Sequence, residues 1–239
     1  MFTRKMVSPV CCFIFLAVFF LAVFQSALAV DFTDDNYDVQ ELPHCEIISL
    51  NTNRFDGSRP LIIFLPGYME CDNINHVAHW IREYDLYDEV DADIVTTAFW
   101  QEPAGNGSWR FMAEDLAGCL SELETAGDLT VVIDSVSSSG FCGCYLAQLL
   151  RDKGVHVQEL NLAEACSTYG VTVDLIRELA ASGIRVNIWI GSEEAVWSKD
   201  SREYAAALEG TENVYSTVLN VEKHGQELSV AIHEHGLHR

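Results

Sequence analysis

The 239-residue chain holds 36 acidic and 14 basic side chains, which gives a formal net charge of −22 at neutral pH. So acidic a chain repels nucleic acid and anionic membrane surfaces, and the composition argues against both as partners. No linker or repeat divides the sequence after residue 29, and the remaining length is enough for one sizeable domain with its own core.

The N-terminus has the three parts of a secretory signal peptide. Arg4 and Lys5 precede an apolar run over residues 10–24, which ends in Ala27-Leu28-Ala29. The apolar run is short for a membrane span, although an uncleaved anchor is the alternative interpretation. We therefore expect a signal peptide over 1–29, cleaved after Ala29, and one domain over 30–239 in the extracellular space or the secretory-pathway lumen. Because residues 1–29 hold two cations and no anion, this domain has a charge of −24.

Six cysteines remain after residue 29, namely Cys45, Cys71, Cys119, Cys142, Cys144 and Cys166. An even number in an exported chain predicts disulfide bonds, but the spacing does not choose the pairing. Cys142 and Cys144 are two residues apart on a predicted helix and are therefore not expected to pair. The spacings fit no zinc module, and we expect no metal.

In the first half, residues 30–43 are acidic and predict an irregular surface arm. A strand follows at 44–51 as the first arm of a hairpin, with a turn at 54–60. Residues 61–65 form a continuous apolar run, which is typical of a strand buried on both faces of a mainly parallel sheet. We expect a helix at 76–84, a strand at 93–99 and a helix at 109–124.

In the second half, strands and helices alternate. We expect strands at 129–133, 155–162, 184–190 and 214–221, and helices from about 141 and at 173–182 and 201–208. This alternation predicts a mostly parallel, twisted sheet with helices on both faces, a three-layer αβα sandwich. His233, His235 and His238 follow in what reads as a polar, frayed tail. A tail site for zinc or copper is the alternative.

The strand at 129–133 runs into a sharp turn of small residues, Ser135-Val136-Ser137-Ser138-Ser139, before a helix. A side chain at the apex would be presented above the sheet, beside a helix N-terminus that favours negative charge. The pattern resembles the nucleophile elbow of the α/β-hydrolase fold family, written G-x-S-x-G, with serine in place of both glycines. The resemblance implies that Ser137 is a nucleophile. The simpler interpretation is a turn in which Ser137 or Ser138 caps the helix.

Two later loops extend the resemblance. Gly191-Ser192-Glu193-Glu194 resembles the family's Gly-x-x-Asp loop, which implies that Glu194 is the acid of a catalytic triad. Glu193 and Glu164 remain alternative acids. His224, in a His-Gly pair after the last predicted strand, corresponds to the family's catalytic base. Ser, acid, His is also the family's chain order.

The turn Pro66-Gly67-Tyr68 after the strand at 61–65 completes the set. In the family a similar turn contributes one backbone N–H to the oxyanion hole, which implies Tyr68 here, with Ser138 supplying the second. The connection between the strands at 155–162 and 184–190 is short, so no helical lid is expected. The resemblance covers most of the chain after residue 29.

Together these features predict a secreted, lipase-like serine esterase that cleaves small-molecule or lipid carboxylic esters through an acyl-enzyme, without a cofactor. A lipase, thioesterase or peptidase would use the same chemistry. A catalytically degenerate α/β-hydrolase-like binding protein and a disulfide-bonded interaction domain are the competing classes. The sequence leaves the acyl and leaving groups, the disulfide pairing and the oligomeric state open.

Overall fold

The computed structural model describes residues 38–50, 57–67, 87, 90–99, 106–123, 126–192, 198–221 and 226–235. All of them belong to one compact unit, Asn36–Arg239. The expected signal peptide, the domain boundary at residue 30 and the helix at 76–84 lie outside the described residues and stay predictions.

The described strands form a single sheet in the order β1-β2-β4-β3-β5-β6-β7-β8. Their bounds are β1 Asp38–Glu41, β2 Cys45–Ser49, β3 Leu61–Leu65, β4 Asp93–Phe99, β5 Thr130–Val136, β6 His156–Ala163, β7 Arg185–Ile190 and β8 Val214–Val218. The hairpin β1–β2 is antiparallel, as is the pair β2–β4, and every pair from β4 to β8 is parallel. The predicted mostly parallel sheet is confirmed.

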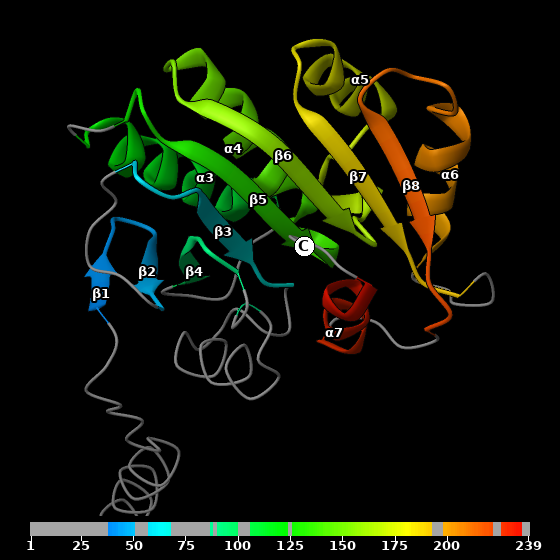
Figure 1. Ribbon diagram of the computed structural model, residues 1–239, viewed down its shortest axis with the longest axis horizontal. Helices are drawn as coiled ribbons and strands as arrows, with labels where there is room; N and C mark the ends of the chain where they lie inside the picture. Colours follow the sequence, from blue (N-terminus) through cyan, green and yellow to red (C-terminus); the bar gives the residue numbers. More distant parts are fainter. Residues whose placement is uncertain are drawn as a thin grey trace, which may run out of the picture. The chain divides into compact units, whose positions relative to one another are not determined.

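Helices cover both faces of this sheet (Figure 1). The described helices are α3 Asn106–Ser121, α4 Gly140–Asp152, α5 Val173–Ala181, α6 Lys199–Ala207 and α7 Gln226–His235. β3 is buried throughout: Leu61, Ile63 and Leu65 face the core under α3 to α6, while Ile62 and Phe64 face the core under α7. The predicted αβα layers are therefore present, and the carboxyl ends of the parallel strands share one edge.

A chain of buried polar side chains crosses the α7 face of β5, β6 and β7. Asp134 accepts hydrogen bonds from the Tyr87 hydroxyl at 2.7 Å and the Asn161 amide at 2.8 Å. The Asn161 carbonyl oxygen in turn accepts from the Asn187 amide at 2.8 Å and the Trp189 indole at 3.1 Å. Burial raises the pKa of Tyr87 well above its ordinary value, so its hydroxyl stays a donor. Paired in this way, the polar groups favour one strand register.

Three sequence expectations need correction. Residues 38–41 form β1, not an irregular arm, and pair with β2 as the other arm of the hairpin. β5 continues past Asp134 to Val136, because Asp134 finds hydrogen-bond partners inside the sheet. Residues 226–235 form α7 instead of a frayed tail, since Leu228 and Ile232 recur at helical spacing and fill the core on that face.

None of the five described cysteines, Cys45, Cys119, Cys142, Cys144 and Cys166, forms a disulfide bond. The expected disulfide bonds are therefore absent among these five. Cys142 and Cys144 are buried in the apolar core. This burial raises the pKa of Cys144 to about 12. The sixth cysteine, Cys71, lies outside the described residues. No described helix is long and apolar enough to cross a membrane.

Candidate functional site

Ser137 occupies the sharp turn between β5 and α4. Its φ of 58° lies in the left-handed region, which a residue with a Cβ rarely adopts. A 3₁₀ turn over Ser137–Ser139 then leads directly into α4. The first N–H groups of a helix have no partner within the helix, so this turn lies where negative charge is favoured. The local geometry is that of a strained residue presented at a helix N-terminus.

Ser139 fixes the base of this turn. Its buried hydroxyl accepts a hydrogen bond from the Val136 N–H at 2.9 Å and donates to the Leu65 carbonyl at 2.7 Å, at the end of β3. The N-cap of α4 is Ser139, with no side-chain cap bond, so the alternative that Ser137 or Ser138 caps this helix is wrong. Sequence reasoning treated Ser139 only as a small residue, and no sequence signal indicated its bond to β3.

The serine that replaces the first elbow glycine is accommodated by a glycine on the helix. A Cβ at Gly143 would lie 2.0 Å from the Ser135 hydroxyl, so α4 approaches β5 this closely only because residue 143 has no side chain. Gly140 makes the same kind of approach to Ala165, whose Cβ would be 2.5 Å from a Cβ at 140. The small residues that let β5 and α4 approach closely therefore include Gly140 and Gly143 on the helix.

The loop after β6 lies against the turn at Ser137. The Cys166 N–H donates to the Ser137 carbonyl at 3.2 Å, and the Cys166 sulfur lies 3.8 Å from the Ser137 hydroxyl. Burial raises the pKa of the Cys166 thiol, so it is neutral at pH 7. A neutral thiol is a poor nucleophile.

Glu164, one of the alternative acids, follows β6 directly and is fully buried. Its Oε1 atom accepts hydrogen bonds from the Gly191 N–H at 3.2 Å and from the Ser198 hydroxyl. Its φ of 50° is left-handed, as at Ser137. The sequence pointed to Glu164 only as an acid following a strand and did not point to Ser198.

The remaining predicted site residues lie outside the described residues, namely Tyr68, Glu193, Glu194 and His224. The described residues next to them show how their loops begin. The Ser192 N–H, after β7, donates to the Val221 carbonyl, after β8, at 2.7 Å. The segments that lead to the predicted acid and base therefore start side by side. Of the predicted oxyanion donors, Ser138 is described and is buried in the 3₁₀ turn beside Ser137.

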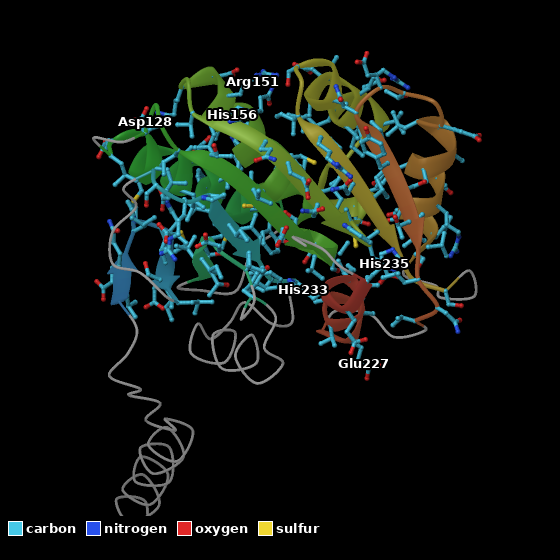
Figure 2. The ribbon with its side chains drawn as sticks, in the orientation of Figure 1. Asp128, Arg151, His156, Glu227, His233 and His235 are labelled. Atoms are coloured by element: carbon cyan, nitrogen blue, oxygen red, sulfur yellow. The ribbon has the colours of Figure 1, made fainter. Side chains whose placement is uncertain are left out.

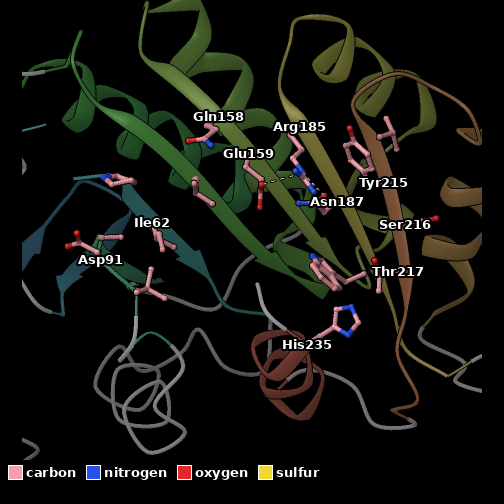
Figure 3. Close-up of a pocket in the computed structure, with 16 residues that line it drawn as sticks. Ile62, Asp91, Gln158, Glu159, Arg185, Asn187, Tyr215, Ser216, Thr217 and His235 are labelled. Atoms are coloured by element: carbon pink, nitrogen blue, oxygen red, sulfur yellow. Dashed lines mark hydrogen bonds and ion pairs between the residues drawn. The ribbon is translucent and has the colours of Figure 1, made fainter. Parts of the chain in front are cut away.

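A separate groove of about 930 Å³ lies on the α7 face, lined mainly by residues of β6, β7 and β8 (Figure 3). Arg185 crosses it between Glu159, whose Oε2 is 3.6 Å from Nε, and the ring of Tyr215, 4.6 Å below the guanidinium. None of residues 135–139, which form the turn between β5 and α4, lines this groove. It is therefore distinct from the candidate catalytic edge.

The histidines at the end of α7 do not form a metal site with other described residues. The rings of His233 and His235 contact Tyr87 and Trp189, at centroid distances of 4.7 and 5.8 Å, while Glu227 points away from the sheet (Figure 2). Within the described ranges, no group of three or more His, Cys, Asp or Glu side chains is placed to hold a metal ion.

No protein-family model matches this chain, and no curated protein matches its sequence. Solved structures do match. An esterase from the archaeon Pyrobaculum calidifontis is 15% identical with a TM-score of 0.55, over 84% of this chain and 79% of that chain. A fungal esterase from Rhizomucor miehei is 14% identical with a TM-score of 0.52, over 98% of this chain and 95% of the other.

An ester hydrolase from the metagenome of Lake Arreo is 13% identical with a TM-score of 0.52, over 82% of this chain and 76% of that chain. At these identities the likeness shows the fold alone. The chain has the α/β-hydrolase fold.

Proposed function

We propose that this protein is a serine hydrolase that cleaves carboxylic esters through an acyl-enzyme. Ser137 is the nucleophile, His224 the general base and Glu194 the acid that orients the histidine. The backbone N–H groups of Tyr68 and Ser138 form the oxyanion hole. The similar solved structures include esterases and an ester hydrolase, which supports this reaction class.

One observation carries the proposal: Ser137 has a left-handed backbone at the junction of β5 and α4. Such a conformation costs about 1–3 kcal/mol for a residue with a side chain, and strain of this size is retained mainly where a site needs it. The hydrogen bond from the Ser139 hydroxyl to the Leu65 carbonyl, at the end of β3, also stabilises this turn. A serine that only connected a strand to a helix would gain nothing from this strain.

The reaction follows from the proposed roles. His224 takes the proton from the Ser137 hydroxyl as its oxygen attacks the ester carbonyl carbon, and the carbonyl oxygen gains the negative charge. The N–H groups of Ser138 and Tyr68 stabilise this oxyanion, at about 3 kcal/mol for each donor. His224 then donates the proton to the leaving alcohol. Water, activated by the same histidine, releases the acid and restores Ser137.

The setting of this activity is also proposed from the sequence. The first 29 residues support export, and the substrate is then a small-molecule or lipid ester outside the cytoplasm. The short connection between β6 and β7, with only a 3₁₀ turn and α5, supports a site without a helical lid. The mature protein is proposed to have no stable membrane anchor.

The proposal is tested by measuring hydrolysis of p-nitrophenyl acetate, butyrate and octanoate by the protein without its first 29 residues. We expect turnover that Ser137→Ala lowers by at least about 10³-fold. The matched control is Ser121→Ala, a hydroxyl on α3 that bonds the Gly118 carbonyl outside the site. Equal rates in wild type and Ser137→Ala contradict the proposal, and a folded wild type without turnover on any ester favours a binding protein.

A further inference from the structure

Glu164 makes contacts that the triad of Ser137, Glu194 and His224 does not explain. Its buried Oε1 atom accepts the Gly191 N–H and the Ser198 hydroxyl. These two residues stand at either end of the segment 192–197, which contains both Glu193 and Glu194. One carboxylate oxygen therefore fastens both ends of the loop that carries the proposed triad acid. We call Glu164, Gly191 and Ser198 the Glu164 cluster.

The packing around Gly191 shows how tight this cluster is. A Cβ at residue 191 would lie 2.4 Å from the Glu164 Oε1 atom and 2.9 Å from the Val221 carbonyl oxygen. Only glycine lets the backbone after β7 come this close to both groups. Val221 also accepts from the Ser192 N–H, and it is three residues before His224. The cluster thus lies where the segments that lead to the proposed acid and the proposed base meet.

The same short segment also reaches the nucleophile. Two residues after Glu164, the Cys166 N–H holds the Ser137 carbonyl at 3.2 Å. Gly140 at the start of α4 approaches Ala165, between the two. Residues 164–166 therefore contact the nucleophile turn on one side and the stem of the acid loop on the other.

From these contacts we infer that Glu164 is a positioning residue, which sets the place of the acid loop relative to Ser137 through its Oε1 atom. The inference rests on the proposed function and adds a residue to it. It also changes the role of Glu164 from alternative acid to support. A positioning residue at 164 needs only an oxygen that accepts hydrogen bonds, and Glu164→Gln keeps one. A triad acid needs a negative charge to stabilise the imidazolium, and Glu164→Gln removes it.

The test compares Glu164→Gln, Glu164→Ala and Ser198→Ala in ester hydrolysis and in amide hydrogen exchange of the peptides that cover residues 189–200. We expect Glu164→Ala to lower kcat by about 10²-fold with little change in KM, since misplacement of a catalytic group by about 1 Å has this effect. Glu164→Gln keeps kcat within about 10-fold of wild type. Exchange at Gly191 and Ser192 becomes at least about 10-fold faster in Glu164→Ala.

If Glu164→Ala does not fold, Ser198→Ala still tests the inference, because it removes only the one hydroxyl group that donates to Glu164. It is expected to lower kcat less than Glu164→Ala and to speed exchange in the same peptides. The matched control is Ser201→Ala, a buried serine one turn along α6 whose hydroxyl has no hydrogen-bond partner among the described residues. Glu159→Gln, on β6, the strand that Glu164 follows, is the control for the loss of charge.

A loss of about 10⁴-fold in Glu164→Gln would identify Glu164 as the triad acid and overturn the positioning role. Unchanged exchange and unchanged kcat in both Glu164→Ala and Ser198→Ala overturn it as well. Hydrogen exchange does not depend on turnover. If the wild-type protein hydrolyses no ester, the proposed function fails, while the exchange data still decide whether Glu164 holds this loop.

Discussion

Two buried carboxylates on neighbouring strands, Asp134 on β5 and Glu164 after β6, have different partners. Asp134 accepts from the Tyr87 hydroxyl and from Asn161, a side chain on β6, within the body of the sheet. Glu164 accepts from the Gly191 N–H and the Ser198 hydroxyl, which belong to the segments before and after a loop at the sheet's carboxyl edge. The same chemical group thus fixes strands in one region and loops in the other.

We expect this difference to separate residues that determine the free energy of unfolding from residues that determine the rate of ester hydrolysis. The buried polar side chains linked to Asp134 lie under α7 and include no residue of the proposed triad. Damage to them should therefore lower the free energy of unfolding more than the rate of ester hydrolysis. Damage at the carboxyl edge should lower the rate more than the free energy of unfolding.

The largest effect is expected at the carboxyl edge, from Glu194→Gln. An amide does not stabilise the imidazolium of His224 and favours the wrong tautomer, so kcat should fall by about 10⁴-fold. Steady-state hydrolysis of a p-nitrophenyl ester measures this, with Glu193→Gln as the matched control. Equal losses in Glu194→Gln, Glu193→Gln and Glu164→Gln contradict the assignment of the acid.

In the body of the sheet, Asp134→Leu should act on stability. It leaves two buried donors, the Tyr87 hydroxyl and the Asn161 amide, without their acceptor, and we expect a loss of about 3 kcal/mol in the free energy of unfolding. Urea denaturation measures it, and kcat for the folded protein should stay within about 3-fold. The exposed Asp91→Leu is the control. A large fall in kcat with unchanged stability would reverse the contrast.

The junction of the two regions is tested at Gly143. Gly143→Ala places a methyl group against the Ser135 hydroxyl, and overpacking of this kind costs about 2 kcal/mol. Adding Ser135→Gly removes the hydroxyl and should recover most of the loss in a double-mutant cycle. Strict additivity of the two changes would show that α4 and β5 adjust independently at this contact.

The smallest effect concerns high pH. Burial raises the pKa of Tyr87 in the folded protein above about 10, its value in the unfolded chain. Below pH 10 the contribution of Tyr87 to the free energy of unfolding is fully present. Above pH 10 the unfolded chain loses the Tyr87 proton first, so this contribution falls by up to about 1.4 kcal/mol for each pH unit. Tyr87→Phe should make the free energy of unfolding fall less steeply between pH 10 and 11. The half-exposed Tyr215→Phe is the control, and identical slopes in all three proteins contradict the prediction.

Much of the fold could be predicted because its signals are local. The apolar runs at 61–65 and 184–190 and the alternation of strands and helices are enough to indicate a parallel sheet. β1 was missed because Asp38 and Glu41 make it read as an acidic arm, while the pairing with β2 that supports it is a tertiary contact. The end of β5 was misjudged because the partners of Asp134, Tyr87 and Asn161, are 47 and 27 residues away in sequence.

For the candidate site, the sequence pointed to side chains but not to their supports. Ser137 stood out because small residues surround it between a strand and a helix. Ser139 and Ser198 carry no such signal, since their partners, Leu65 and Glu164, are 74 and 34 residues away. Gly143 likewise looks like an ordinary helix residue until β5 is placed against it.

If Ser137 is an activated nucleophile, it reacts covalently with a fluorophosphonate probe. The folded protein without residues 1–29 is treated with the probe, and the label is located by mass spectrometry of its peptides, beside Ser137→Ala and His224→Ala. We expect one label on Ser137, lost in the first variant and formed much more slowly in the second. No label on folded wild-type protein, or a label that remains in Ser137→Ala, contradicts this expectation.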